Sequence, residues 1–199
     1  MLTFIIPTIG RDTLATTLDS LRAQSDKRWK AIVLFDGIPP TLESPDPRIS
    51  ILTCPKLGQG KNHAGRVRNI GMEKATTEWV GFVDDDDTLS PQYTQTFYQE
   101  IASYPKMDTI IFRMSQGNII LPPLSIDTFQ KNYVGISFAM RRSLFQKFKM
   151  EPSATEDYDL LDRIRSGGHP MMISPYTLYF VRDAKKEIDV CGYRVLINS

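Results

Sequence analysis

Four consecutive aspartates, Asp84–Asp87, follow an apolar run and form a dense group of carboxylates. Like charges raise one another's pKa, so such a run is costly without a counter-charge. Carboxylate oxygens suit Mg²⁺ and Mn²⁺, with water and phosphate completing the shell. The run indicates an Asp-x-Asp metal site for a nucleoside diphosphate; taken alone, a solvated acidic turn that caps the next helix is an equal alternative. If strand geometry continues, Asp84 and Asp86 point to one side, and Asp85 and Asp87 to the other.

A second candidate is the basic segment Gly58–Gly71, which contains Lys61, Arg66 and Arg68. A helix N-terminus with basic side chains nearby favours an anion. The segment is neither a P-loop, because no Ser or Thr follows Lys61, nor a G-x-G-x-x-G dinucleotide motif. Taken alone, it is better explained as an ordinary surface helix in which Gly71 allows close packing on a sheet.

A third candidate is the acidic start of a later helix, at Glu156 and Asp157. Thr155 can cap this helix, and acidic residues in a first turn complement the helix dipole. Capping and the helix dipole are enough to explain acidic residues at the start of this helix. The functional alternative is that Glu156 or Asp157 removes a proton from a hydroxyl, which requires burial to raise the pKa of the carboxyl and the hydroxyl to lie within reach.

The elements that carry these residues alternate between apolar β-rich runs and helical patterns, which predicts an α/β fold with a mainly parallel sheet. The expected strands are 2–6, 29–35, 49–53, 79–83 and 109–114. The expected helices are 13–24 with Asp12 as N-cap, 62–75, and 91–103 with Ser90 as N-cap. Ligands bind beyond the carboxyl ends of such strands. Thr8, Asp36 and the four aspartates are therefore expected at one edge of the sheet.

The pattern changes near residue 115. It predicts a strand or hairpin at 116–123, a strand at 134–140, helices at 142–147 and 156–166, and strands at 171–173 and 177–181. The tail 187–197 fits either a strand or an amphipathic end. We expect one domain over 1–199, with a nucleotide-binding half, 1–115, and an acceptor-side half, 116–199.

The composition excludes several classes of protein. The chain has 199 residues with 24 Lys and Arg against 23 Asp and Glu, a net charge of +1, which does not favour nucleic-acid binding. No apolar run approaches the roughly 20 residues that span a bilayer. The N-terminus lacks signal-peptide features, and two cysteines, Cys54 and Cys191, are too few for a disulfide framework. We expect a cytoplasmic protein whose membrane contact is at most peripheral.

Taken together, the motifs resemble the family 2 glycosyltransferases of the GT-A fold. The resemblance spans roughly residues 3–182 and rests on five motifs in order: Phe4-Ile5-Ile6-Pro7-Thr8, Asp36, Val67-Arg68-Asn69-Ile70-Gly71, Phe82-Val83-Asp84-Asp85-Asp86-Asp87, and Glu156-Asp157-Tyr158-Asp159-Leu160. It implies a GT-A sheet flanked by helices, with a smaller mixed portion on the acceptor side.

The resemblance also implies a nucleotide-binding set: Thr8, Arg11, Asp36, Arg66, Arg68, Asn69, Asp84 and Asp85. In this set Thr8 and Asp36 would hold the base, with Asp36 accepting from a uracil-type N–H. Asp84 or Asp85 would contact the ribose. The arginines and the asparagine of the basic helix would contact the nucleotide or fix that helix.

The catalytic and metal positions follow from the same resemblance. Asp86, with Asp84 as a further candidate, would ligate Mn²⁺ or Mg²⁺. Asp157 would act as the base, with Glu156 as its nearest rival. The implied reaction is metal-dependent and inverting, by a single displacement. It moves a sugar from a nucleoside diphosphate, UDP before GDP, to a hydroxyl of a glycan, glycolipid or glycoprotein.

The sequence departs from the family pattern in two places. It lacks the Gln-x-x-Arg-Trp motif of processive synthases, and 148–153 lacks the usual Gly-Phe-Asp. Two alternatives stay open: a non-catalytic or regulatory Mg²⁺–nucleotide module of the same fold, and a sugar nucleotidyltransferase. The second requires a glycine-rich basic loop after the first strand, and Pro7–Arg11 is poor in glycine.

Overall fold

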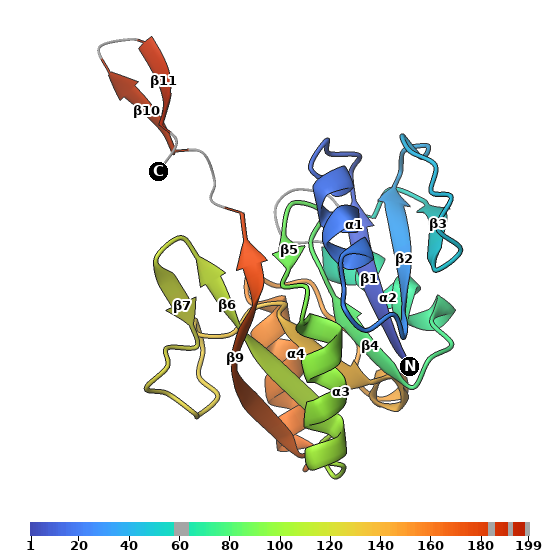
Figure 1. The fold of residues 1–199 in the computed structure, drawn as a ribbon, viewed down its shortest axis with the longest axis vertical. Helices are drawn as coiled ribbons and strands as arrows, with labels where there is room; N and C mark the ends of the chain where they lie inside the picture. The colour runs from blue at the N-terminus through green and yellow to red at the C-terminus, as the bar shows by residue number, and fades with distance from the viewer. Residues whose placement is uncertain (58–63, 183–185, 191–192, 198–199) are drawn as a thin grey trace.

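One curved nine-stranded sheet forms the centre of the molecule, in the order β3-β2-β1-β4-β8-β6-β9-β5 with β7 paired to β6 (Figure 1). This computed structural model describes residues 1–57, 64–182, 186–190 and 193–197. The strands are β1 Leu2–Thr8, β2 Trp29–Asp36, β3 Ile49–Cys54, β4 Trp79–Phe82, β5 Thr88–Leu89, β6 Thr109–Gln116, β7 Ile119–Leu121, β8 Phe138–Arg141 and β9 Met171–Val181. The helices are α1 Leu14–Arg22, α2 Ala64–Lys74, α3 Tyr93–Ser103, the 3-10 turn η1 Arg142–Gln146, and α4 Glu156–Ser166.

The sheet is mostly parallel, as predicted. β3, β2, β1 and β4 run parallel to one another, β6 runs parallel to β9, and β8 lies antiparallel between β4 and β6. β1 is buried along its whole length, as befits a central strand covered on both faces. Because β8 lies between β4 and β6, which precede it in the chain, the earlier and later parts of the chain share one sheet.

The start of two helices differs from the prediction. Asp12 does not cap the first helix; Thr13 occupies the N-cap position with no side-chain cap bond. The N-cap of α3 is Gln92 and not Ser90. The reason is that the backbone N–H of Ser90 donates to the Leu178 carbonyl at 2.9 Å, which extends the β5–β9 pairing and delays the helix.

The later part of the chain also has differences. The two strands expected at 171–173 and 177–181 form one strand, β9, whose pairing with β6 changes register around Arg113. The tail forms an antiparallel pair of its own, β10 Lys186–Val190 and β11 Tyr193–Ile197, so the strand alternative is confirmed. Cys191 and residues 58–63, which include the expected start of the basic helix, lie outside the described residues.

The helices are short, with α1 the shortest α-helix at 9 residues and α2, α3 and α4 at 11 each. None of the helices in the described part of the chain is long and apolar enough to cross a membrane.

Helix α2 lies directly on β1 and β2, and Gly71 permits this approach. A Cβ atom at Gly71 would lie 2.4 Å from Cγ2 of Ile5 and 2.9 Å from Cδ1 of Leu34. Both side chains are fully buried in the core and have no room to move aside. The expectation of close packing at Gly71 is confirmed, and it fixes the helix that carries Arg68 over the sheet.

Gly71→Ala is expected to lower the free energy of unfolding by about 1–3 kcal/mol, because overpacking outweighs the better helix propensity of alanine. Urea denaturation followed by circular dichroism measures the change. Lys74→Ala, at the exposed end of the same helix, is the control and should stay within about 0.5 kcal/mol of the parent. A Gly71→Ala protein as stable as the parent would contradict the packing argument.

Candidate active site

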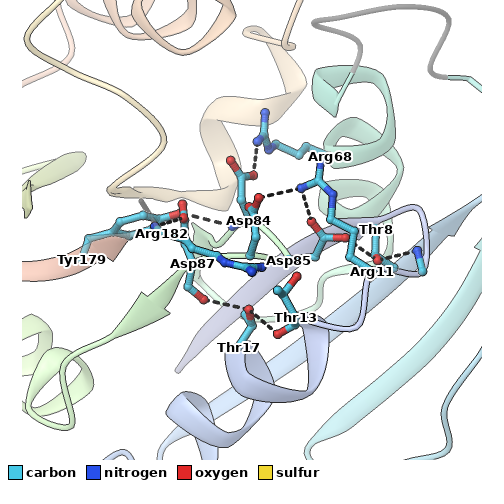
Figure 2. Close-up of polar contacts among 12 residues, drawn as sticks. Thr8, Arg11, Thr13, Thr17, Arg68, Asp84, Asp85, Asp87, Tyr179 and Arg182 are labelled. Atoms are coloured by element: carbon cyan, nitrogen blue, oxygen red, sulfur yellow. Dashed lines mark hydrogen bonds and ion pairs between the residues drawn. The ribbon is translucent and has the colours of Figure 1, made fainter. Parts of the chain in front are cut away.

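The four aspartates form a turn beyond the end of β4. The strand stops at Phe82, and the backbone N–H of Asp87 donates to the carbonyl of Asp84 at 3.1 Å. The expected strand-like alternation of side chains is therefore wrong, because Asp85 and Asp86 share one arginine. Asp84 and Asp87 turn to other partners (Figure 2). We call Asp84–Asp87 the acidic turn.

The end of β1 meets the acidic turn, as expected for strands that end at one edge of the sheet. The Thr8 hydroxyl donates to Oδ2 of Asp85 at 2.6 Å. Nη1 of Arg11 lies 2.9 Å from Oδ1 of Asp85 and 2.8 Å from Oδ2 of Asp86. Burial raises the pKa of Asp85, although the Thr8 hydrogen bond and the Arg11 charge act in the opposite direction.

Asp87 is held by β9 and by the residue that follows this strand. The Tyr179 hydroxyl donates to Oδ2 of Asp87 at 2.7 Å, and the backbone N–H of Arg182 donates to Oδ1 at 2.9 Å. Burial, with the nearby Asp84 carboxylate, raises the pKa of Asp87 to about 6. The Tyr179 side chain is fully buried, and its hydroxyl also accepts from the N–H of Asp84 at 3.1 Å.

Arg68 of α2 joins the acidic turn to the start of α4. Its guanidinium forms a short contact with Oδ1 of Asp84, lies 2.7 Å from Oε1 of Glu156 and lies 3.7 Å from Oδ1 of Asp157. The residue is 3 % exposed. Burial acts to lower the pKa of Arg68, but the three carboxylates outweigh it and raise the pKa above its ordinary value.

Glu156 and Asp157, at the start of α4, differ in what holds them. Glu156 is buried, and both its oxygens are engaged, Oε1 by Arg68 and Oε2 by the N–H of Gly65 at 3.2 Å. Oδ1 of Asp157 is buried but accepts no hydrogen bond from the described residues. Burial raises the pKa of Asp157 to about 6; Arg68 opposes this shift, and Asp84 and Glu156 add to it.

The other residues of the expected nucleotide-binding set lie in varied places. The Asn69 side chain accepts from the N–H of Met150 at 2.9 Å and donates to its carbonyl at 2.8 Å, so it fixes that segment on α2. Arg66 is exposed. Asp36 is buried at the end of β2, where its carboxylate accepts from the Leu57 N–H at 2.6 Å and pairs with Lys56 at 3.1 Å.

The carboxylates of the acidic turn suit a divalent cation that keeps much of its water. No group of three or more His, Cys, Asp or Glu side chains poised to hold a metal occurs among the described residues. The side chains of Asp84 and Asp86 are 36 % and 35 % exposed, and the Arg11 guanidinium takes the place of a cation between Asp85 and Asp86. Mg²⁺ is commonly bound by one or two carboxylates plus substrate phosphates, so this donor set fits such an ion.

Comparison with known proteins assigns the chain. Residues 3–180 match the family Glycosyl transferase family 2. The chain belongs to this family. Among its relatives is Glycosyltransferase GlyA of Streptococcus pneumoniae serotype 4, which is 26 % identical over 144 residues that cover 68 % of this chain and 20 % of GlyA. The chain therefore spans about a fifth of the length of this relative.

Solved structures share the fold. S. aureus TarS 1-349 superposes with a TM-score of 0.72 at 16 % identity, over 90 % of this chain and 60 % of that one. The same fragment in complex with UDP-GlcNAc has a TM-score of 0.69 at 15 % identity, over 94 % of this chain and 59 % of that one. The GT-A expectation for this family 2 chain is confirmed.

Arg68→Ala is expected to destabilise the protein by about 3–5 kcal/mol, because it leaves three carboxylates around a buried position without their cation. In the variant the pKa values of these carboxylates rise in the folded state above those of the unfolded chain. The folded state then binds more protons, so stability is lost as pH rises, and the deficit should be larger at pH 8 than at pH 5. Urea denaturation at both pH values measures it.

Arg22→Ala is the control for Arg68→Ala. Arg22 pairs with Asp19 on the surface of α1, where the Asp19 side chain is 73 % exposed. Exposed pairs contribute about 0–1 kcal/mol, so this variant should be close to the parent at both pH values. A deficit of Arg68→Ala that is small or independent of pH would show that Arg68 does not neutralise the cluster.

Proposed function

We propose that this chain binds a nucleoside diphosphate sugar at the acidic turn and transfers the sugar, with inversion, to an acceptor hydroxyl. The observation that carries the proposal is the Arg68 guanidinium, which contacts Asp84 of the acidic turn and lies 3.7 Å from Asp157. Arg68 therefore brings Asp157, a carboxylate suited to proton transfer, close to the acidic turn. The carboxylates of that turn are suited to binding the sugar-nucleotide donor. The family, and the UDP-GlcNAc complex of the TarS fragment, support a sugar nucleotide with UDP before GDP.

The donor would lie across the ends of β1, β2 and β4. Thr8 fixes Asp85 by its hydrogen bond, and Asp84 or Asp85 would contact the ribose. Asp36, at the end of β2, would hold the base. Asp86, with Asp84, would hold Mn²⁺ or Mg²⁺. The bound ion would offset the negative charge that develops on the leaving diphosphate.

Asp157 would be the base. With a pKa of about 6 it is largely ionised at neutral pH, and its Oδ1 accepts no hydrogen bond from the described residues. It would take the proton of the acceptor hydroxyl while that oxygen forms a bond to the anomeric carbon and the bond from this carbon to the diphosphate breaks. One displacement inverts the anomeric centre and releases the nucleoside diphosphate. Glu156 is less suited because Arg68 and Gly65 engage both its oxygens.

Asp157→Asn is expected to keep donor binding but to lose turnover by about 10²–10⁴-fold, because asparagine has the shape of aspartate but cannot act as the base. Release of UDP or GDP from a panel of sugar nucleotides, with water as the acceptor, gives the rate, and calorimetry with UDP and Mn²⁺ gives binding.

In the parent the rate should rise with pH through about 6 and be about tenfold lower at pH 5 than at its plateau, since only ionised Asp157 accepts a proton.

Asp162→Asn, near the other end of α4, is the control and should behave as the parent, because Asp162 pairs only with a surface arginine in the described residues. Normal turnover by Asp157→Asn would move the base to Glu156 or elsewhere. Nucleotide binding by a parent protein that turns over no sugar nucleotide would instead favour the non-catalytic module.

Asp86→Asn is expected to abolish the part of UDP binding that depends on Mn²⁺. A ligand that binds only the folded state stabilises it by about 2.7 kcal/mol at 100 times its dissociation constant, so a thermal shift with UDP is readily detected. The parent should show a shift that needs the metal, and the variant should not. Asp19→Asn, an exposed carboxylate on α1, is the control. Equal shifts in parent and Asp86→Asn would overturn the metal assignment.

A further inference from the structure

Arg11, on the loop between β1 and α1, contacts the acidic turn through one nitrogen. Nη1 lies 2.9 Å from Oδ1 of Asp85 and 2.8 Å from Oδ2 of Asp86, and the Arg11 side chain is 48 % exposed. Among the described residues, all hydrogen bonds of the Arg11 side chain use Nη1. A guanidinium has five N–H donors in a rigid fork, so Nε and Nη2 remain able to bind further acceptor oxygens.

The two carboxylates that Arg11 contacts have different surroundings. The Asp85 side chain is 6 % exposed and is also held by Thr8, whereas the Asp86 side chain is 35 % exposed. Exposed ion pairs contribute little free energy, so the contact with Asp86 is easily exchanged. The buried contact with Asp85 is the one that keeps Arg11 at the site.

The backbone conformation just before Arg11 places this residue beside the acidic turn. Gly10 has a φ of +83°, and a Cβ atom there would lie 2.7 Å from Cδ1 of Ile38. The Gly10 N–H donates to the Thr8 hydroxyl at 2.9 Å, and the same hydroxyl donates to Asp85. The turn from Thr8 to Arg11 and the acidic turn therefore form one hydrogen-bonded unit.

We propose that Arg11 holds Asp86 in place of the divalent cation until the nucleotide arrives, and then turns its unused donors to the diphosphate. This inference rests on the proposed function. Metal alone must compete with Arg11 for Asp86. When the diphosphate is present, Arg11 gains phosphate oxygens as it releases Asp86. Arg11 thereby makes metal and nucleotide bind cooperatively, and the coupling is the same from either ligand's side.

The test measures Mn²⁺ binding to the whole chain, from the electron paramagnetic resonance signal of free Mn²⁺, without UDP and with saturating UDP. Arg11→Gln should bind Mn²⁺ alone about fivefold more tightly, because an exposed ion pair no longer opposes it. The same variant should bind UDP in the presence of Mn²⁺ about tenfold more weakly, because charged hydrogen bonds to phosphate are lost. These two changes have opposite signs, which a purely structural role would not produce.

Two further variants sharpen the result. Arg11→Lys keeps the positive charge and should bind Mn²⁺ alone as weakly as the parent. Arg22→Gln removes a half-buried arginine of α1 that pairs with Asp19, away from the acidic turn, and should change neither affinity. Weaker UDP binding by Arg11→Gln with unchanged affinity for Mn²⁺ alone would make Arg11 only a phosphate ligand and overturn the inference. Weaker binding of both ligands, with a lower melting temperature, would make it only a support of the acidic turn.

The experiment also separates this inference from the function on which it rests. A parent protein that binds Mn²⁺ neither alone nor with UDP would overturn the metal-dependent donor site itself. A parent that binds Mn²⁺ and UDP together, with no opposite effects in Arg11→Gln, would leave that donor site intact and overturn only the role of Arg11.

Discussion

The buried guanidinium of Arg68 is the constraint on which the arrangement of the site depends. It lies between carboxylates of the acidic turn and of α4, which would otherwise repel one another across a region of low exposure. Gly65 and Asn69 of the same helix contact the segment around Met150 and Glu156 as well. One side of α2 therefore sets the separation between the proposed donor and acceptor sides.

The same helix is fixed to the sheet by its other contacts. Gly71 allows α2 to approach Ile5 and Leu34 within a distance that no larger residue permits. The position of Arg68 relative to the carboxyl ends of β1 and β4 is thus set by core packing, which is stiff, rather than by surface contacts. Packing at Gly71 and charge at Arg68 act through one helix, so we expect a change at either position to alter the relation of Asp84 to Asp157.

The sequence allowed the sheet and the edge of the site to be predicted because both depend on local pattern and chain order. Thr8 and the acidic turn meet because parallel strands end at one edge. The directions of the four aspartates could not be predicted, because they depend on where β4 stops and on Tyr179, 92 residues beyond Asp87. The bond from Ser90 to Leu178 that delays α3 is likewise a contact between distant segments.

The charge balance of the site supports a role for an added cation. The carboxylates of the acidic turn lie close to those of Glu156 and Asp157, and in the described residues the arginine side chains that contact this group are those of Arg11 and Arg68. Burial is the largest cause of the raised pKa values in this group, because buried carboxylates are poorly solvated. The residues concerned are Asp85, Asp87, Glu156 and Asp157. A diphosphate would add further negative charge to the same place. Under the proposed function, a divalent ion at Asp86 would supply the positive charge that offsets it.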